Sequence, residues 1–276
     1  MAACYPPPME SHPAETAFDL FARVSHGRTA DEVVRQIELL LLEGVLRDGD
    51  RLPGERELSK RFDVSRPILR EALKELEVRG LLVSQHGGGT YVADIIGQVF
   101  SRPVIDLIAR HQRATFDYLE YRRALEGITA ELAAQRATDY DRQVLKAILD
   151  DMRNAHASGR FEDELSADID LHGAIGEAAH NIILLHTLRA CYRLLEQGIF
   201  FHRHLVFASD EARGRLLAQH EAICEAIIGG EPAVAKAAAE AHIDYIAGAV
   251  REAERSGEWQ RVSQLRMQQR NAGKCE

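Results

Sequence analysis

Long apolar runs are absent from this sequence, and none approaches the roughly 20 residues that a helix needs to cross a bilayer. The N-terminal stretch carries prolines and acidic residues, where a secretory signal would place a basic segment before an apolar one. Cysteine is also scarce, and the four residues are far apart: Cys4, Cys191, Cys224 and Cys275. This spacing indicates neither a disulfide framework nor a thiolate zinc site. We therefore expect a cytoplasmic protein that is neither exported nor membrane-bound.

Aromatic residues, which favour strands, make up only 6% of the 276 residues, whereas helix formers such as alanine, leucine, glutamate and arginine are abundant. Apolar residues account for 46% and charged residues for 28%, as in an ordinary globular protein. The length is long for one domain and sufficient for two. The composition thus predicts a mainly α-helical protein with two domains.

The formal net charge of −9 argues against a protein that coats nucleic acid, but the charge is unevenly distributed. Between Arg51 and Lys74 there are seven basic and four acidic residues, a local net charge of +3. From Ala93 onward, acidic residues predominate. A small basic region on an acidic protein is suited to local, salt-sensitive contact with DNA.

The first hundred residues contain the pattern of three helices followed by a hairpin. Apolar residues recur at helical spacing from a capping-box pattern at Thr29 to a stop at Gly44. A shorter helix is predicted up to residue 62, and Ser65 can cap a third helix with one apolar face. Residues 81–92 then indicate a strand, a glycine turn and a returning strand. This order predicts a winged helix-turn-helix, whose third helix enters the major groove of DNA.

On the third predicted helix, Arg66, Arg70 and Lys74 are spaced four residues apart and form one charged row. The alternative is that this row only keeps an ordinary helix soluble. The order of the elements and the coincidence of the basic region with the third helix favour DNA binding.

From about residue 100 the sequence indicates helices with apolar periodicity, interrupted near Asp139, Gly159, Asn181, Asp210 and Gly229. The expected architecture is an all-helical antiparallel bundle. The predicted domain boundaries are a disordered tail at 1–18, the DNA-binding domain at 19–96, the helical domain at 97–254 and a flexible tail at 255–276.

The helical domain contains four residues that can ligate a metal. Asp168 and His172 are four apart on one helix, and the apolar neighbours of His220 and His242 indicate that both histidines point into the bundle. Three neutral imidazoles and one carboxylate suit a divalent ion, for which zinc is the first expectation, with nickel or manganese as alternatives. Each buried histidine could instead be a hydrogen-bonded core residue.

Several stretches resemble the GntR family of bacterial transcriptional regulators. In the N-terminal half these are LPGEREL at residues 52–58, FDVSRPILREAL at 62–73 and QHGGGTYV at 85–92. In the C-terminal half, YRRALE at 121–126 and EAAHN at 177–181 resemble the FadR subfamily, which carries a helical effector domain of the FCD type. Within that subfamily, the likeness is to regulators concerned with pyruvate dehydrogenase, lactate and glycolate.

The resemblance implies which residues contact DNA. The family uses an arginine after a Pro-x-Glu pattern, here Arg56, and two arginines of the recognition helix, here Arg66 and Arg70, beside Ser65 at the start of that helix. The wing tip of the family reaches the minor groove, which points to His86 and Gly87. An arginine can give two hydrogen bonds to guanine or to phosphate.

The resemblance also implies roles in the helical domain. Metal-binding members carry an Asp-x-x-x-His pattern and two later histidines, which correspond here to Asp168, His172, His220 and His242. Arg122 matches the arginine that meets the carboxylate of an effector, and Glu126 could hold it by an ion pair. The implied effector is a small organic acid, such as a 2-hydroxy or 2-oxo acid.

Three functions follow as hypotheses. The first is a repressor, a homodimer on a palindromic operator in double-stranded DNA, whose affinity for the operator is controlled by an organic acid. The second is a metalloregulator in which the ion itself is the signal. The third is a metal-dependent enzyme, which we disfavour because no additional general base accompanies the ligands and the DNA-binding half would be unexplained.

Overall fold

The computed structural model of the protein describes residues 29–85, 88–95, 111–196 and 210–272. The chain divides into two compact units, the first formed by residues up to Leu41 with Gly49–Ala93, the second by Leu42–Asp48 with the chain from Asp94 onward. The predicted N-terminal tail lies outside the described residues. None of the described helices is long and apolar enough to cross a membrane.

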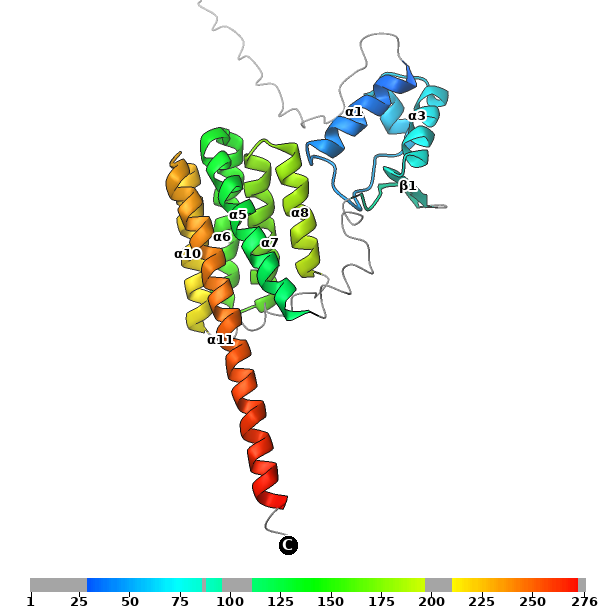
Figure 1. The fold of residues 1–276 in the computed structure, drawn as a ribbon. Coiled ribbons are helices and arrows are strands. Elements are labelled where there is room, and N and C mark those ends of the chain that lie inside the picture. Colours follow the sequence, from blue (N-terminus) through cyan, green and yellow to red (C-terminus); the bar gives the residue numbers. More distant parts are fainter. Residues whose placement is uncertain (1–28, 86–87, 96–110, 197–209, 273–276) are drawn as a thin grey trace, which may run out of the picture. The chain divides into compact units, whose positions relative to one another are not determined.

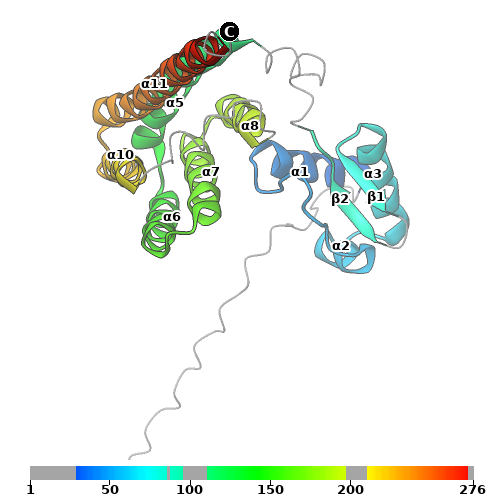
Figure 2. The ribbon, with the colours of Figure 1, turned by 90° about the horizontal axis from the view of Figure 1, so that it is seen from below.

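The described residues of the first unit form three helices and a two-stranded sheet (Figure 2). Their bounds are α1 Ala30–Leu42, α2 Glu55–Arg61, α3 Arg66–Val78, β1 Leu82–Gln85 and β2 Gly89–Val92. The strands pair antiparallel, with Leu82 opposite Val92 and Gln85 opposite Gly89. This is the winged helix-turn-helix that the sequence predicts.

The core of the first unit is built from the apolar faces of the three helices. Ile37 of α1, Leu58 of α2 and Leu69 of α3 are at most 1% exposed, and Phe62, between α2 and α3, is fully buried. Gly44 ends the first helical pattern with a φ of 72°, a conformation that glycine adopts without steric cost. Because one face of α3 is used for packing, its opposite face is left to solvent.

The second unit is a helical bundle, drawn from green to red in Figure 1. The described helices are α5 Gln112–Arg136, α6 Asp139–Ser158, α7 Phe161–Ala178, α8 Ile182–Glu196, α10 Asp210–Ile228 and α11 Pro232–Ala272. The interruptions expected from the sequence coincide with the ends of these helices. For example, Thr138 forms a capping box with Asp141 at the start of α6, and Gly159 ends that helix in the left-handed conformation.

Helix α5 packs against α7, α8, α10 and α11, so it is central to the second unit. Apolar side chains of α5, α6, α7, α10 and α11 form one core cluster, and a second cluster lies among α5, α8 and α11. Cys191 and Cys224 are buried within these clusters, and burial raises the pKa of Cys224 to about 12. The two thiols therefore remain protonated core residues at neutral pH.

Helix α11 is 41 residues long and its C-terminal half continues past the other helices of its unit (Figure 1). The sequence pattern predicts a flexible tail from Arg255, whereas the helix continues to Ala272. Once a helix is formed, adding a residue costs far less than starting a new helix, so weak apolar periodicity does not end it.

Replacing Leu171 with alanine should test the packing of the second unit. Leu171 is fully buried on α7, so its truncation should lower the free energy of unfolding by about 2–5 kcal/mol. Denaturant unfolding followed by circular dichroism measures this value. Ile183→Ala, at a residue that is 75% exposed, is the control and should change it by less than about 0.5 kcal/mol. Equal effects of the two variants would contradict the packing described here.

Candidate nucleic-acid interface and candidate metal centre

The turn between α2 and α3 fixes the orientation of the third helix. Asp63 adopts a positive φ of 56°, which aspartate tolerates better than most residues, and the amide of Val64 donates to the carbonyl of Ser59 at 3.0 Å. Val64 is buried, and Pro67 lies in the first turn of α3. This tight connection presents the exposed face of α3 beside the start of α2.

The structure places four residues predicted to contact DNA, Arg56, Ser65, Arg66 and Arg70, on the surface of the first unit. The Nε atom of Arg70 donates to Oε2 of Glu55 at 2.8 Å, which brings the guanidinium to the first turn of α2, where Arg56 also lies. Neither Arg56 nor Arg66 makes an ion pair with another described residue. The guanidinium groups are thus accessible, and none is used in the core.

Ser65 is the N-cap residue of α3, as the sequence predicts, but its side chain makes no capping hydrogen bond. The exposed hydroxyl therefore keeps its hydrogen-bonding capacity for another partner. His86 and Gly87, the predicted wing-tip contacts, lie outside the described residues. Sequence reasoning missed Glu55, because nothing in the spacing indicates that a residue of α2 pairs with Arg70.

In the second unit, three helices bring together the four residues predicted to bind a metal: Asp168, His172, His220 and His242. Asp168 and His172 come from α7, His220 from α10 and His242 from α11, and each residue offers one ligand atom that lies within 4.8 Å of the others. Two atoms that both bind one ion at about 2.1 Å can be at most about 4.2 Å apart. Small side-chain rotations therefore suffice to close the four ligands around an ion.

Nitrogen atoms of this cluster are buried without hydrogen-bond partners. They are Nε2 of His172, Nε2 of His242, and both ring nitrogens of His220. The three histidines are at most 3% exposed. A buried polar atom without a partner costs about 1–3 kcal/mol, so four such atoms at one place are unfavourable. One ion can bind one nitrogen of each ring, so a cation would remove this cost at three of the four atoms, and Nε2 of His220 also lies 3.2 Å from Oδ1 of Asp168. These three ring nitrogens make the donor set fit a metal ion.

The second nitrogen of His242 is held by a residue that the sequence analysis did not identify. Nδ1 of His242 lies 3.0 Å from Oε1 of Gln219 on α10. With the amide oxygen as acceptor, Nδ1 carries the proton and Nε2 keeps its lone pair. Burial, followed by repulsion from His220 and His172, holds the pKa of His242 well below its ordinary value. The ring is therefore neutral, as a metal ligand must be.

Next to the cluster, Arg122 of α5 forms the ion pair with Glu126 that the sequence predicts. Nε of Arg122 donates to Oε1 of Glu126 at 2.6 Å, and both side chains are 4% exposed. Nη2 of Arg122 donates to the hydroxyl of Tyr192 at 2.6 Å. This hydroxyl in turn donates to Oε1 of Glu126 at 3.1 Å. Burial opposes both charges, but mutual attraction raises the pKa of Arg122 and lowers that of Glu126.

Two further contacts connect this ion pair to the cluster. Nδ1 of His172 lies 3.1 Å from Oε2 of Glu126, although no aligned hydrogen bond reaches that oxygen. The ring of His172 also stacks on that of Tyr192, with 4.8 Å between the centroids. Sequence spacing could indicate the Arg122–Glu126 pair within one helix, but not these contacts, because they join α5 and α8 to α7.

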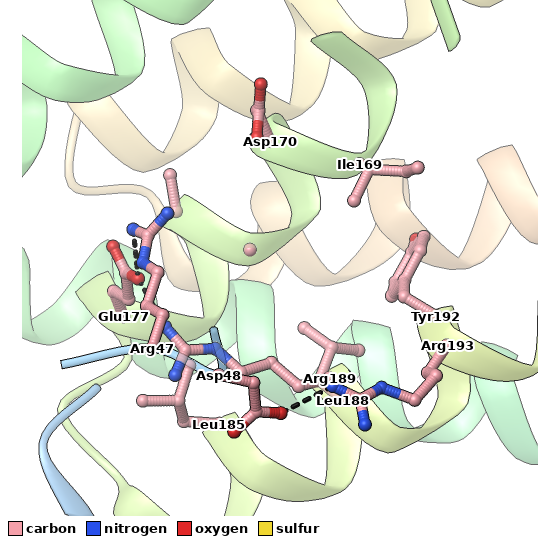
Figure 3. A pocket seen from close by; sticks show the side chains of 12 residues that line it. Arg47, Asp48, Ile169, Asp170, Glu177, Leu185, Leu188, Arg189, Tyr192 and Arg193 are labelled. Atoms are coloured by element: carbon pink, nitrogen blue, oxygen red, sulfur yellow. Dashed lines mark hydrogen bonds and ion pairs between the residues drawn. The ribbon is translucent and has the colours of Figure 1, made fainter. Parts of the chain in front are cut away.

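A separate pocket of about 220 Å³ lies between α7 and α8 (Figure 3). Arg47 and Glu177 lie at one end and Tyr192 and Arg193 at the other, and all the lining residues belong to the second unit. No member of the histidine cluster lines it. Carboxylates already pair with its arginines: Glu177 lies 2.7 Å from both Arg47 and Arg189. The pocket thus has no surplus positive charge that would select an anion.

A smaller cavity of about 20 Å³ reaches the cluster itself, where Asp168 and His220 contribute to its wall. This volume accommodates about one water molecule. On its other side, Arg213 forms a two-nitrogen ion pair with the buried carboxylate of Glu164. The charges of Arg213 and Glu164 on that side of the cluster therefore neutralise each other.

The chain matches two protein families along its length. The family described as "Bacterial regulatory proteins, gntR family" matches residues 29–92, and the FCD domain matches residues 117–245. These ranges cover the helix-turn-helix unit and the part of the bundle that contains Arg122 and the histidine cluster. The match confirms the resemblance stated from the sequence.

Curated relatives support this assignment. A protein of Escherichia coli (strain K12) named for regulation of the L-lactate dehydrogenase operon is 34% identical over 223 residues, 79% of this chain and 85% of the relative. The Glc operon transcriptional activator of the same strain is 31% identical, over 76% and 84% of the two chains. The regulator LutR of Bacillus subtilis (strain 168) is 30% identical, over 75% and 94%. The protein is a transcriptional regulator of the GntR family with a C-terminal FCD domain, rather than an enzyme.

Proposed function

We propose that this regulator binds a divalent metal ion in its FCD domain and that a small organic acid, bound beside the ion, controls its affinity for operator DNA. The observation that carries this proposal is the set of buried ring nitrogens without partners on His172, His220 and His242. Neutral imidazoles in a bundle core normally find hydrogen-bond partners. A site that leaves their lone pairs unused is built for a Lewis acid.

The donor set favours zinc, with nickel or manganese as alternatives. Three imidazole nitrogens and one carboxylate oxygen are borderline donors that suit zinc and nickel, whereas the carboxylate also admits manganese. Such an ion, when bound, keeps coordination positions that oxygen atoms of an acid can take. The two carboxylates and the one guanidinium near the rings, Asp168, Glu126 and Arg122, leave an excess negative charge that favours a cation.

Arg122 is the group that we propose for the carboxylate of the acid. Its guanidinium is buried beside the cluster and keeps donors besides those used by Glu126 and Tyr192. The guanidinium would bind the carboxylate of the acid, and the ion would bind its other oxygen atoms. This arrangement suits an acid with a second oxygen beside its carboxylate, which is a 2-hydroxy or 2-oxo acid. One relative is named for the L-lactate dehydrogenase operon, and lactate is a 2-hydroxy acid.

For DNA, we propose that Arg56, Ser65, Arg66 and Arg70, together with the wing tip at His86 and Gly87, form the contact surface. A homodimer of this cytoplasmic protein would place two recognition helices on a palindromic site in double-stranded DNA. Bound over a promoter, the dimer would repress by occlusion. The Glc operon relative is named an activator, so membership of the family does not by itself imply repression.

The second candidate is a metalloregulator in which the ion itself is the signal. It is favoured by the fact that Arg122 is already paired with Glu126 and Tyr192 and is 4% exposed, so an acid must compete with them. Removing the metal with a chelator would change operator affinity in either case. Only the first candidate also requires a response to acids at constant metal occupancy.

Replacing Arg66 or Arg70 with alanine should weaken specific DNA binding. Each variant should lose about 1–3 kcal/mol of binding free energy if the arginine makes a bidentate base contact, measured by gel shift on the operator at fixed salt. Arg79→Ala is the control, because Arg79 is the C-cap residue that follows α3 and it pairs with Glu38 and Glu75. Unchanged affinity in both Arg66→Ala and Arg70→Ala would refute this contact surface.

Replacing His220 with alanine should reduce the bound metal per chain, because one of four ligands is lost, while the folded first unit still binds the operator with the affinity of the metal-free wild type. Elemental analysis of protein loaded with zinc and then desalted measures the metal content. His180→Asn is the control, since His180 lies outside the cluster, pairs with Asp141 and has a positive φ that asparagine tolerates. Full metal content in His220→Ala would show that the cluster is not the site.

Replacing Arg122 with glutamine should abolish the response to acids without removing the metal. L-lactate and pyruvate should raise the melting temperature and change operator affinity in the wild type, whereas propionate, which lacks the 2-oxygen, should do neither. Arg123→Gln is the control, because the neighbouring Arg123 pairs with Asp244 and Glu240 and is 41% exposed. A metal-loaded wild type that ignores every acid in a broader panel would favour the metalloregulator.

A further inference from the structure

Glu126 is the residue whose two carboxylate oxygens face different parts of the site. Oε1 accepts from Arg122 at 2.6 Å and from the hydroxyl of Tyr192 at 3.1 Å. Oε2 points the other way and lies 3.1 Å from Nδ1 of His172. The side chain is 4% exposed, so bulk solvent does not reach the second oxygen. The carboxylate therefore spans the distance between the guanidinium and a residue of the cluster.

His242 shows what such a contact does to a ring. Its Nδ1 faces Oε1 of Gln219 at 3.0 Å, and its Nε2 has no partner. His172 has the same arrangement, with Nδ1 facing Glu126 and Nε2 without a partner. An acceptor at Nδ1 fixes the proton on that nitrogen and keeps the lone pair of Nε2 for the ion, while a carboxylate acceptor also makes the imidazole a better donor to metal.

We propose that Glu126 is a positioning residue that links the metal site to the acid-binding guanidinium, holding His172 with one oxygen and Arg122 with the other. The inference rests on the proposed function, since it concerns the same site. A small rotation of either side chain aligns Nδ1–H of His172 with Oε2, which satisfies the buried oxygen that has no aligned donor. Each partner then depends on the same carboxylate.

The alternative is that Glu126 only neutralises the buried charge of Arg122. In that case its loss would destabilise the bundle but would not act on His172. The two roles differ in the ligand field of the bound ion, and in the zinc affinity of a variant that removes Glu126 and Arg122 together, because that variant leaves the net charge near the rings unchanged. These readouts separate a positioning role from a structural one.

The test measures zinc affinity of the full chain by competition with a chromophoric chelator, after removal of metal. Glu126→Gln should weaken zinc binding about 10–100-fold, the usual effect of losing such an outer carboxylate. Glu131→Gln is the control: Glu131 lies on the same helix and pairs with Lys236 at 3.0 Å, so affinity should stay within about twofold.

If Glu126→Gln does not fold, the same measurement is made on the double variant Arg122→Gln with Glu126→Gln. This variant removes both charges of the buried ion pair, so no unpaired charge stays in the core. At saturating Co²⁺, the d–d absorption bands should shift in the Glu126 variants and coincide with the wild type in Glu131→Gln. Equal zinc affinity in wild type and Glu126 variants, or a lower affinity with unshifted cobalt bands, would overturn the proposal. A wild type that binds no zinc would instead refute the proposed metal site, which distinguishes the two failures.

Discussion

The constraint on which the second unit depends is the cost of burying polar atoms in an apolar bundle. Three imidazoles lie beside a core built mainly from leucine, isoleucine and alanine, and several of their nitrogens have no hydrogen-bond partner. Hydrophobic burial of the surrounding helices holds these rings in place, because each helix also contributes to the core clusters. The bundle thereby keeps its donor atoms available to a ligand and away from water.

The same constraint governs the charges next to the rings. Arg122 can be buried only because Glu126 and Tyr192 accept its hydrogen bonds, and this network lies on the central helix of the unit. Helix α5 contacts the helices that supply every candidate ligand. Arg122 lies on this helix. A ligand that competes for its hydrogen bonds would therefore change the packing of α5 against the other helices, and this gives a small molecule a physical means of controlling the domain.

In the first unit the charged residues are exposed to solvent, unlike those of the second unit. Its candidate contacts are exposed arginines, and Glu55 pairs with Arg70 in place of a phosphate or a base. An exposed ion pair of this kind is worth little, so exchanging it for DNA costs little. On a protein whose net charge is −9, this local surface also limits where DNA can approach. The second unit, whose polar site is buried, is thus suited to sensing a ligand, and the first unit, whose arginines are exposed, is suited to binding DNA.

The sequence by itself determined the helical class, the winged helix-turn-helix, the inward direction of the histidines and the Arg122–Glu126 pair, because periodicity and capping act within one element. It did not indicate that α11 continues to Ala272, that Glu55 pairs with Arg70, or that Gln219 and Glu126 face the rings of His242 and His172. Apart from the length of α11, these features are contacts between different helices. Only the tertiary structure decided them, because the packing of side chains sets which residues of neighbouring helices meet, and spacing along the chain carries no information about that distance.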